Sequence, residues 1–159
     1  MLKWIAVLFG FLLSAQPVMA DEREKLLGVW KLVSFDLEYR ETGERKPVFG
    51  AKPRGYIILL PEGRTMAVLT AEGRTIPKTD EDRLAAFRTM YAYSGLYRIE
   101  GDKWITKVDV AWNEAWSGTD QVRFFKFDGP RLQIVTAWQP SVNEPGRTTR
   151  GMLIWEREK

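Results

Sequence analysis

Apolar and polar side chains alternate along the stretch from Gly28 to Tyr39. The apolar members are Val33, Phe35, Leu37 and Tyr39, and the polar members between them are Ser34, Asp36 and Glu38. A two-residue period predicts a β-strand with one polar face. Gly28 lacks a Cβ atom, so it allows the chain to turn sharply into this strand from a short charged helical turn over residues 21–27.

Further segments rich in β-branched and aromatic residues follow, separated by turns rich in Gly, Pro and Asp. The predicted strands are 54–60, 64–70, 95–100, 103–112, 119–127, 131–137 and 148–156. Together with the first segment they give eight antiparallel strands in up-and-down order. Closure of such a set pairs its edge strands and leaves an interior about wide enough for one small ligand. We therefore predict an all-β fold, an eight-stranded antiparallel up-and-down barrel.

The predicted hairpin 54–70 is apolar on both faces. Pairing Leu60 with Arg64 across the three-residue loop 61–63 defines the two faces. One face carries Ile57, Leu59, Thr65 and Ala67, and the other carries Tyr56, Ile58, Met66 and Val68. Such a hairpin must be covered on both sides, and the sequence leaves open which face is inside.

One helix is predicted after the third strand. Thr79 followed by Asp82 is a variant of the capping box, and acidic residues in the first turn suit the helix dipole. A stripe at helical spacing extends the helix to about Tyr93, with Gly95 ending it. The stripe consists of Leu84, Phe87, Met90 and Tyr91. We expect it to pack as core, or alternatively to cover a cavity as a lid.

The first twenty residues have the pattern of a secretory signal peptide. Lys3 precedes an apolar run over residues 4–13, and small residues end the segment at Ala20. This run is shorter than the roughly 20 residues that a membrane-spanning helix needs. We therefore expect cleavage after Ala20, and export of a single soluble domain, residues 21–159, to the periplasm or the extracellular space without a stable membrane anchor.

Composition excludes several chemistries, because the sequence contains no His and no Cys. Ser-His-Asp and Cys-His nucleophile systems cannot be built. Zinc sites made from imidazole or thiolate, haem ligation through His or Cys, and cysteine-bound iron-sulfur clusters are excluded as well. Asp, Glu, Tyr and Lys would need strongly shifted pKa values to exchange protons near neutral pH. We assign no catalytic residue, no metal site and no cofactor.

Charge gives no sign of a polyanionic partner. The 24 basic and 21 acidic residues are interspersed along the whole chain. Nucleic-acid-binding domains usually gather Lys and Arg on one face or stripe. We therefore expect no nucleic-acid partner.

Five strings, read in order, resemble the bacterial and fungal lipocalin-like domain family. They are residues 27–35 (LGVWKLVSF), 53–57 (PRGYI), 61–64 (PEGR), 116–123 (WSGTDQVR) and 153–157 (LIWER). The resemblance implies a ligand-binding barrel in which Trp30 plugs the closed end and Arg157 covers its ring through a cation–π contact. Members of the family often carry a histidine in the fifth strand, where this chain has Thr106 and Lys107. This difference weakens any transfer of acid–base chemistry.

Candidate ligand contacts come from a supply of aromatic residues larger than a plug requires. The resemblance favours an inward Arg123, which would be costly to bury without a partner. Asp109 on the preceding strand is the expected partner; an unpaired Arg123 would instead orient a carboxylate or other anionic head of a ligand. The predicted ligand-binding residues are Tyr56, Tyr91, Tyr97, Trp104, Asp109, Trp116 and Arg123. A solid core is the alternative interpretation.

Three functions are compatible with this pattern. The first is an exported binding protein that holds a small hydrophobic or amphipathic molecule in the barrel. The second is a cofactorless isomerase or cyclase that traps its substrate in one conformation, with Tyr97, Asp109 or Arg123 polarising it. The third is a protein-interaction module that uses the loop from Trp138 to Arg147. Ligand identity and oligomeric state do not follow from the sequence.

Overall fold

β1 (Gly28–Tyr39) is the strand at which the sheet closes, because it pairs with β3 on one side and with β10 on the other. The computed structural model describes residues 23–141 and 144–158. The other strands are β2 (Arg45–Pro47), β3 (Arg54–Leu59), β4 (Arg64–Thr70), β5 (Met90–Glu100), β6 (Lys103–Ala111), β7 (Asp120–Asp128), β8 (Arg131–Thr136), β9 (Gln139–Pro140) and β10 (Thr148–Arg157). The helices are α2 (Asp80–Arg88) and the 3-10 helix η1 (Glu114–Trp116).

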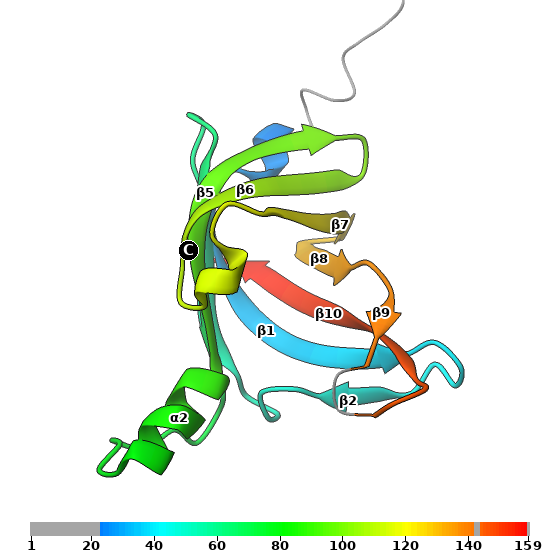
Figure 1. The fold of residues 1–159 in the computed structure, drawn as a ribbon. Helices are drawn as coiled ribbons and strands as arrows, with labels where there is room; N and C mark the ends of the chain where they lie inside the picture. The colour runs from blue at the N-terminus through cyan, green and yellow to red at the C-terminus, as the bar shows by residue number, and fades with distance from the viewer. Residues whose placement is uncertain (1–22, 142–143, 159) are drawn as a thin grey trace, which may run out of the picture.

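The wall of the barrel runs β1-β3-β4-β5-β6-β7-β8-β10 and returns to β1, with every pairing antiparallel. Short β2 and β9 extend the sheet beside β1 and β10. β1 and β10 lie side by side although they come from opposite ends of the chain (Figure 1). The predicted eight-stranded up-and-down barrel is confirmed, and α2 follows β4, the third of the eight wall strands.

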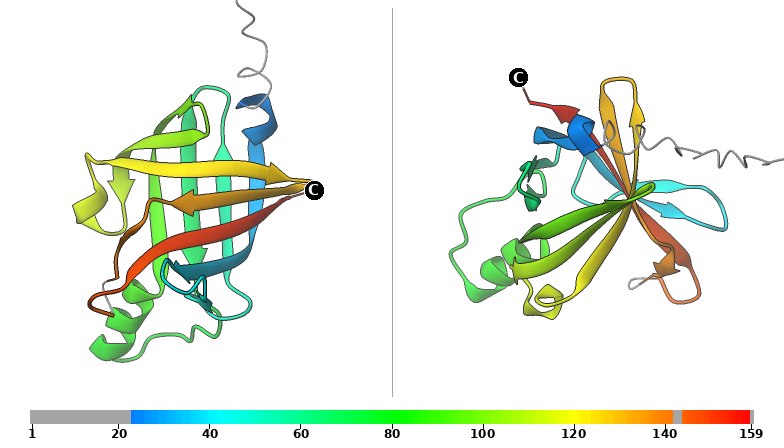
Figure 2. Two further views of the ribbon diagram at one scale, coloured as in Figure 1. Left: turned by 90° about the vertical axis from the view of Figure 1, so that its right-hand side faces the viewer. Right: turned by 90° about the horizontal axis from the view of Figure 1, so that it is seen from above.

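The two ends of the barrel differ. A helical turn at residues 23–26 lies beside the start of β1, whereas α2 projects from the opposite end, outside the strands (Figures 1 and 2). The predicted signal peptide, residues 1–20, lies outside the described residues. Within the described part of the chain, no helix has the length and apolarity needed to cross a bilayer.

The predicted strands agree with the observed ones to within one residue at each end, with one exception. The predicted helix includes residues 90–93, but they belong to β5. The helix prediction was wrong in length and in packing: α2 ends at Arg88, and no residue of it is buried. Thr89 is the C-cap: its backbone N–H makes a last helical bond to the Ala85 carbonyl, and its hydroxyl donates to the same carbonyl. Only the capping box between Thr79 and Asp82 is as expected.

Gly95 is a strand residue rather than a helix terminator. It lies at a bulge between β5 and β6, where the register shifts between Ser94 and Gly95. A Cβ atom at Gly95 would lie 2.1 Å from the carbonyl oxygen of Lys107. Only glycine fits this close approach of two backbones, so the residue marks a bulge.

The hairpin with two apolar faces places Ile57, Leu59, Thr65 and Ala67 inside, where all are buried. Tyr56, Met66 and Val68 lie on the outer face, with exposures of 45%, 50% and 42%. The loop register is as predicted, since the Leu60 N–H donates to the Arg64 carbonyl at 2.9 Å.

An ion-pair cluster joins the outer side of β1 to β10 and β2. The Glu38 side chain is only 11% exposed and accepts from Arg150 at 2.5 Å and from Arg45 at 3.3 Å. Burial by itself would raise the pKa of Glu38, but hydrogen bonds and charges from Arg150 and Arg45 outweigh it and lower that pKa below its ordinary value of 4.5. The Arg150 guanidinium also lies 4.4 Å from the Trp138 ring centroid.

Glu38→Gln is expected to lower the free energy of unfolding by about 1–3 kcal/mol at pH 7, because two arginines lose a charged acceptor. A carboxylate with a lowered pKa stabilises the native state above its unfolded pKa, and that contribution is lost as pH falls through the folded pKa. Urea unfolding should therefore show a clear difference between parent and variant at pH 7 and little at pH 3. Glu62→Gln, in an exposed loop, is the matched control. An equal loss for Glu38→Gln at both pH values would contradict the ion-pair role.

Candidate ligand-binding cavity

One end of the barrel is sealed by Trp30, which is 2% exposed. Its indole N–H donates to the Leu26 carbonyl at 2.8 Å, and the Arg157 guanidinium lies 4.3 Å from its ring centroid. Arg157 also donates to the carbonyl oxygens of Leu27 and Lys25, so it ties the end of β10 to the helical turn. Gly28 has a φ of 113°, and a Cβ there would lie 2.9 Å from Arg157 Nη1. The positive φ favours glycine beside the plug, and a Cβ there would also displace the Arg157 guanidinium.

Beyond this plug the barrel encloses a cavity of about 760 Å³, within the range of about 300–1,000 Å³ typical of small-molecule sites. Trp104 and Trp155 line its buried part, Trp116 lines it from η1, and residues 139–141 line it from β9 and the residue after it. Aliphatic side chains supply much of the remaining surface, namely Leu37, Val48, Ile57, Ala67, Leu69, Ile134 and Leu153. The interior is therefore a cavity rather than a solid core.

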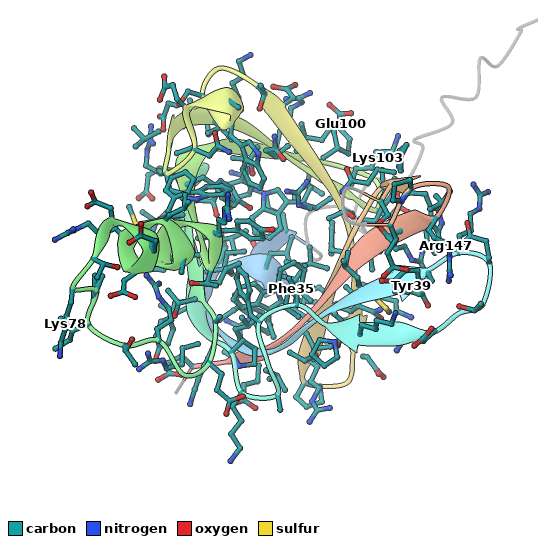
Figure 3. All side chains as sticks on the ribbon, turned by 60° about the horizontal axis from the view of Figure 1, so that its bottom comes forward. Phe35, Tyr39, Lys78, Glu100, Lys103 and Arg147 are labelled. Atoms are coloured by element: carbon teal, nitrogen blue, oxygen red, sulfur yellow. The ribbon has the colours of Figure 1, made fainter. Side chains whose placement is uncertain are left out.

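A continuous cluster of aromatic rings around Tyr91 forms part of one cavity wall, where Phe35, Tyr91 and Trp116 line the cavity and Phe49 and Trp112 do not. The Tyr91 ring centroid lies 5.2 Å from that of Phe49, 4.8 Å from Trp112 and 5.8 Å from Trp116. Phe35 from β1 packs against Tyr91 as well, at 5.9 Å. Figure 3 shows Phe35 among the side chains at the centre of the molecule, whereas Lys78 lies far out beyond α2. Contacts between offset and tilted rings stabilise such a wall beyond simple burial.

At the open end of the barrel, side-chain contacts join the end of β1 to the loop between β9 and β10. The Tyr39 hydroxyl donates to the Glu144 carboxylate, and the Arg147 guanidinium lies 4.7 Å from the Tyr39 ring centroid. Figure 3 shows Tyr39 and Arg147 near each other at this end of β1. Lys46 completes the cluster at 3.6 Å from the Glu144 carboxylate. These contacts hold the rim where the cavity meets residues 139–141.

Arg123 on β7 faces the cavity, opposite Trp104 of β6 and Thr136 of β8. Its guanidinium donates to the side-chain oxygen of Gln121 at 3.0 Å and to the Val122 carbonyl at 2.9 Å. It also lies 5.8 Å from the Trp116 ring centroid. Its hydrogen-bond acceptors among the described residues are neutral.

The predicted pairing of Asp109 with Arg123 is wrong. Asp109 lies on the outer face of β6 and forms an ion pair with Arg64 at 2.8 Å. The β6–β7 register sets Trp104 opposite Arg123. Trp104, Thr106 and Val108 alternate as buried residues along β6, whereas Asp109 is the extra residue at the bulge opposite Ser94 and Gly95 and is exposed.

Other predicted contacts divide between the cavity, its surroundings and the outside. Tyr91, Trp104 and Trp116 line the cavity. Tyr97 is buried next to Trp104, and its hydroxyl donates to the Leu60 carbonyl at 3.0 Å, but it does not line the cavity. Tyr56 lies on the outer face of β3 and cannot contact an interior ligand.

Sequence reasoning missed three aromatic residues that line the cavity, Phe35, Tyr93 and Trp155. Tyr93 was lost because residues 90–93 were assigned to a helix. Trp155 alternates in phase with Leu153, which also faces the interior, so the two-residue period of the last strand is the signal that could have found it.

Two buried indole donors have no protein partner. Trp104 and Trp155 are each 1% exposed, and among the described residues neither indole N–H finds an acceptor. Both residues line the cavity, but their indole nitrogens are covered by protein atoms. Leaving such a donor unsatisfied costs about 1–3 kcal/mol, so folded proteins rarely do so.

Two tyrosine hydroxyls add to these donors. Neither Tyr91 nor Tyr93 forms a side-chain hydrogen bond within the described part of the chain. Burial raises the pKa of both hydroxyls, and the nearby positive charge of Arg123 opposes this only in part. Both hydroxyls are therefore protonated at neutral pH and can donate.

The closed barrel, its sealed end and its aromatic cavity define a ligand-binding kind of fold. The sequence matches the lipocalin-like domain family over residues 27–158, and the chain belongs to that family. The match begins at the plug and runs through β10, so it includes the whole barrel. The predicted family resemblance is confirmed. A search of curated proteins gave no match to the chain.

Proposed function

We propose that this protein is an exported binding protein that holds one small hydrophobic or amphipathic molecule in its barrel. The observation that carries the proposal is the cavity of about 760 Å³ inside the barrel, whose lining is mainly aromatic and aliphatic. Such a lining suits the apolar body of a small ligand, and a few polar groups can orient it. Export is inferred from the signal-peptide pattern of residues 1–20.

The alternative function, a cofactorless isomerase or cyclase, has less support than ligand binding. Of the three residues considered for polarising a substrate, Asp109 is on the outer face. The Tyr97 hydroxyl is bonded to the Leu60 carbonyl. Arg123 alone faces the cavity, and a guanidinium does not exchange protons near neutral pH.

An interaction module built on the loop after β8 also has less support. The Trp138 ring is covered by Arg150 at 4.4 Å and lies 5.8 Å from Arg40. This ring therefore has partners within the chain.

Ala67→Phe is expected to abolish or strongly weaken ligand binding, because Ala67 is buried on β4 and lines the cavity. The neutral probe N-phenyl-1-naphthylamine, titrated into the protein, should show enhanced fluorescence with the parent. The variant should bind it at least about tenfold more weakly, which corresponds to about 1.4 kcal/mol.

Ala92→Phe is the matched control for this substitution. Ala92 lies on β5 opposite the outward Val68, so a ring there adds the same bulk outside the cavity. It should bind the probe as the parent does. Equal probe affinity in the parent and in Ala67→Phe would place the binding elsewhere and contradict the proposal.

A further inference from the structure

Three polar side chains of the cavity lining can donate hydrogen bonds to a ligand. They are the guanidinium of Arg123 and the hydroxyls of Tyr91 and Tyr93. Gln139, Ser141 and Thr149 line the cavity as well and can both donate and accept. Gln121 and Thr136 also line the cavity, but their polar atoms have protein partners. A site of this composition fits a ligand whose polar atoms are acceptors.

Two charged side chains line the described part of the cavity, Asp120 and Arg123, and only Arg123 lacks a partner of opposite charge. Asp120 is the one carboxylate among the described lining residues. It forms ion pairs with Arg98 at 3.4 Å and Lys107 at 3.8 Å, both of them exposed side chains. Arg123 has no carboxylate within 4.0 Å in the described part of the chain. A guanidinium held this way favours an anion from outside the protein.

Three of these donors surround a single ring. The Trp116 ring centroid lies 5.8 Å from the Arg123 guanidinium carbon, 5.8 Å from the Tyr91 ring and 5.6 Å from the Tyr93 ring. Trp116 itself comes from η1. We call Arg123, Tyr91 and Tyr93 the arginine–tyrosine cluster. Its members come from β7 and β5 and combine one fixed positive charge with two neutral hydroxyl donors.

We propose that the ligand carries a carboxylate head, which the arginine–tyrosine cluster binds while its body extends toward Trp104 and Trp155. The inference rests on the proposed function. Arginine presents parallel N–H groups that match the two oxygens of a carboxylate. Its two bonds within the protein, to Gln121 and Val122, use only part of its five N–H donors. The single positive charge of Arg123 also matches a head group with a single negative charge.

The test compares a carboxylic acid with its own ester. Parent protein is titrated with 11-(dansylamino)undecanoic acid and with its methyl ester, and dansyl fluorescence is recorded. The acid should bind at least about tenfold more tightly than the ester. Arg123→Gln should weaken the acid by at least about tenfold and change the ester by less than about twofold, because only the head group loses its partner.

Lys126→Gln is the matched control, since Lys126 lies on the same strand, is exposed and does not line the cavity. It removes one positive charge and should leave both affinities unchanged. Arg123→Lys keeps the charge but not the paired N–H groups, so its preference for the acid should fall between those of the parent and Arg123→Gln. Circular dichroism tests whether each variant is folded. The ratio of the parent's affinities for the acid and the ester tests the inference even if a variant does not fold.

Equal affinities of the parent for acid and ester, or an equal loss of both in Arg123→Gln, would overturn the carboxylate inference. Binding of the ester would in that case still support the proposed function. If the parent bound neither probe, the proposed function and the carboxylate inference would both fail for ligands of this class.

Discussion

A chain that ends at Gly151 is expected not to fold. It lacks most of β10, which pairs with β1 from Trp30↔Arg157 to Tyr39↔Thr149 and with β8 on its other side. It also loses the buried side chains of Met152, Leu153 and Trp155. Removal of one such side chain costs roughly 2–5 kcal/mol, against a total stability of about 5–15 kcal/mol for a typical domain. Circular dichroism during urea unfolding should show no cooperative transition.

The control is a chain that begins at Asp21. It retains the plug, all described strands and the helical turn at residues 23–26. Its unfolding midpoint should match that of the complete chain. A cooperative transition of the shortened chain ending at Gly151, at the midpoint of the parent, would show that closure by β10 is not required.

Strand positions could be predicted because alternation is a local property of the chain. The bounds of β1 and β4 were correct from the pattern alone. The order of the wall also followed, since strands consecutive in sequence usually pair with their neighbours. Closure between β1 and β10 was expected because an open sheet of this length would expose two unpaired edges.

Residues 90–93 show where local pattern fails. Leu84, Phe87 and Tyr91 fit the spacing of a helix, but Tyr91 and Tyr93 fit the two-residue period of a strand equally well. The choice depends on pairing of Tyr91 with Leu69 and of Tyr93 with Ala67. These partners are distant in sequence, so tertiary pairing overrides the local helical signal.

The site was harder to predict than the fold because it depends on which face of each strand is inside. The phase of Arg123 with Phe125 left both faces of its strand open, and only the family resemblance favoured an inward Arg123. The hairpin that contains Tyr56 is apolar on both faces and gives no signal either. The existence of a cavity depends on how the side chains of eight strands fill the interior together. No segment of the sequence contains that information by itself.

Trp30→Ala is expected to lower the free energy of unfolding by roughly 3–5 kcal/mol, the usual cost of truncating a buried aromatic side chain. Trp30 is buried, contacts Phe127 and supports Arg157, so its loss opens the sealed end of the barrel. Arg157→Ala should cost roughly 0.5–2 kcal/mol, because its stem packing and cation–π contact are lost while the indole stays in place. Urea unfolding measured by circular dichroism gives both values.

Trp138→Ala serves as the matched control, since its ring lies under Arg150 outside the sealed end and its loss should cost only about 1 kcal/mol. The double variant at Trp30 and Arg157 adds a sharper test. If Arg157 stabilises the fold partly through the Trp30 ring, the loss in the double variant should be smaller than the sum of the two single losses. A Trp30→Ala protein as stable as the parent would mean that Trp30 does not seal the barrel.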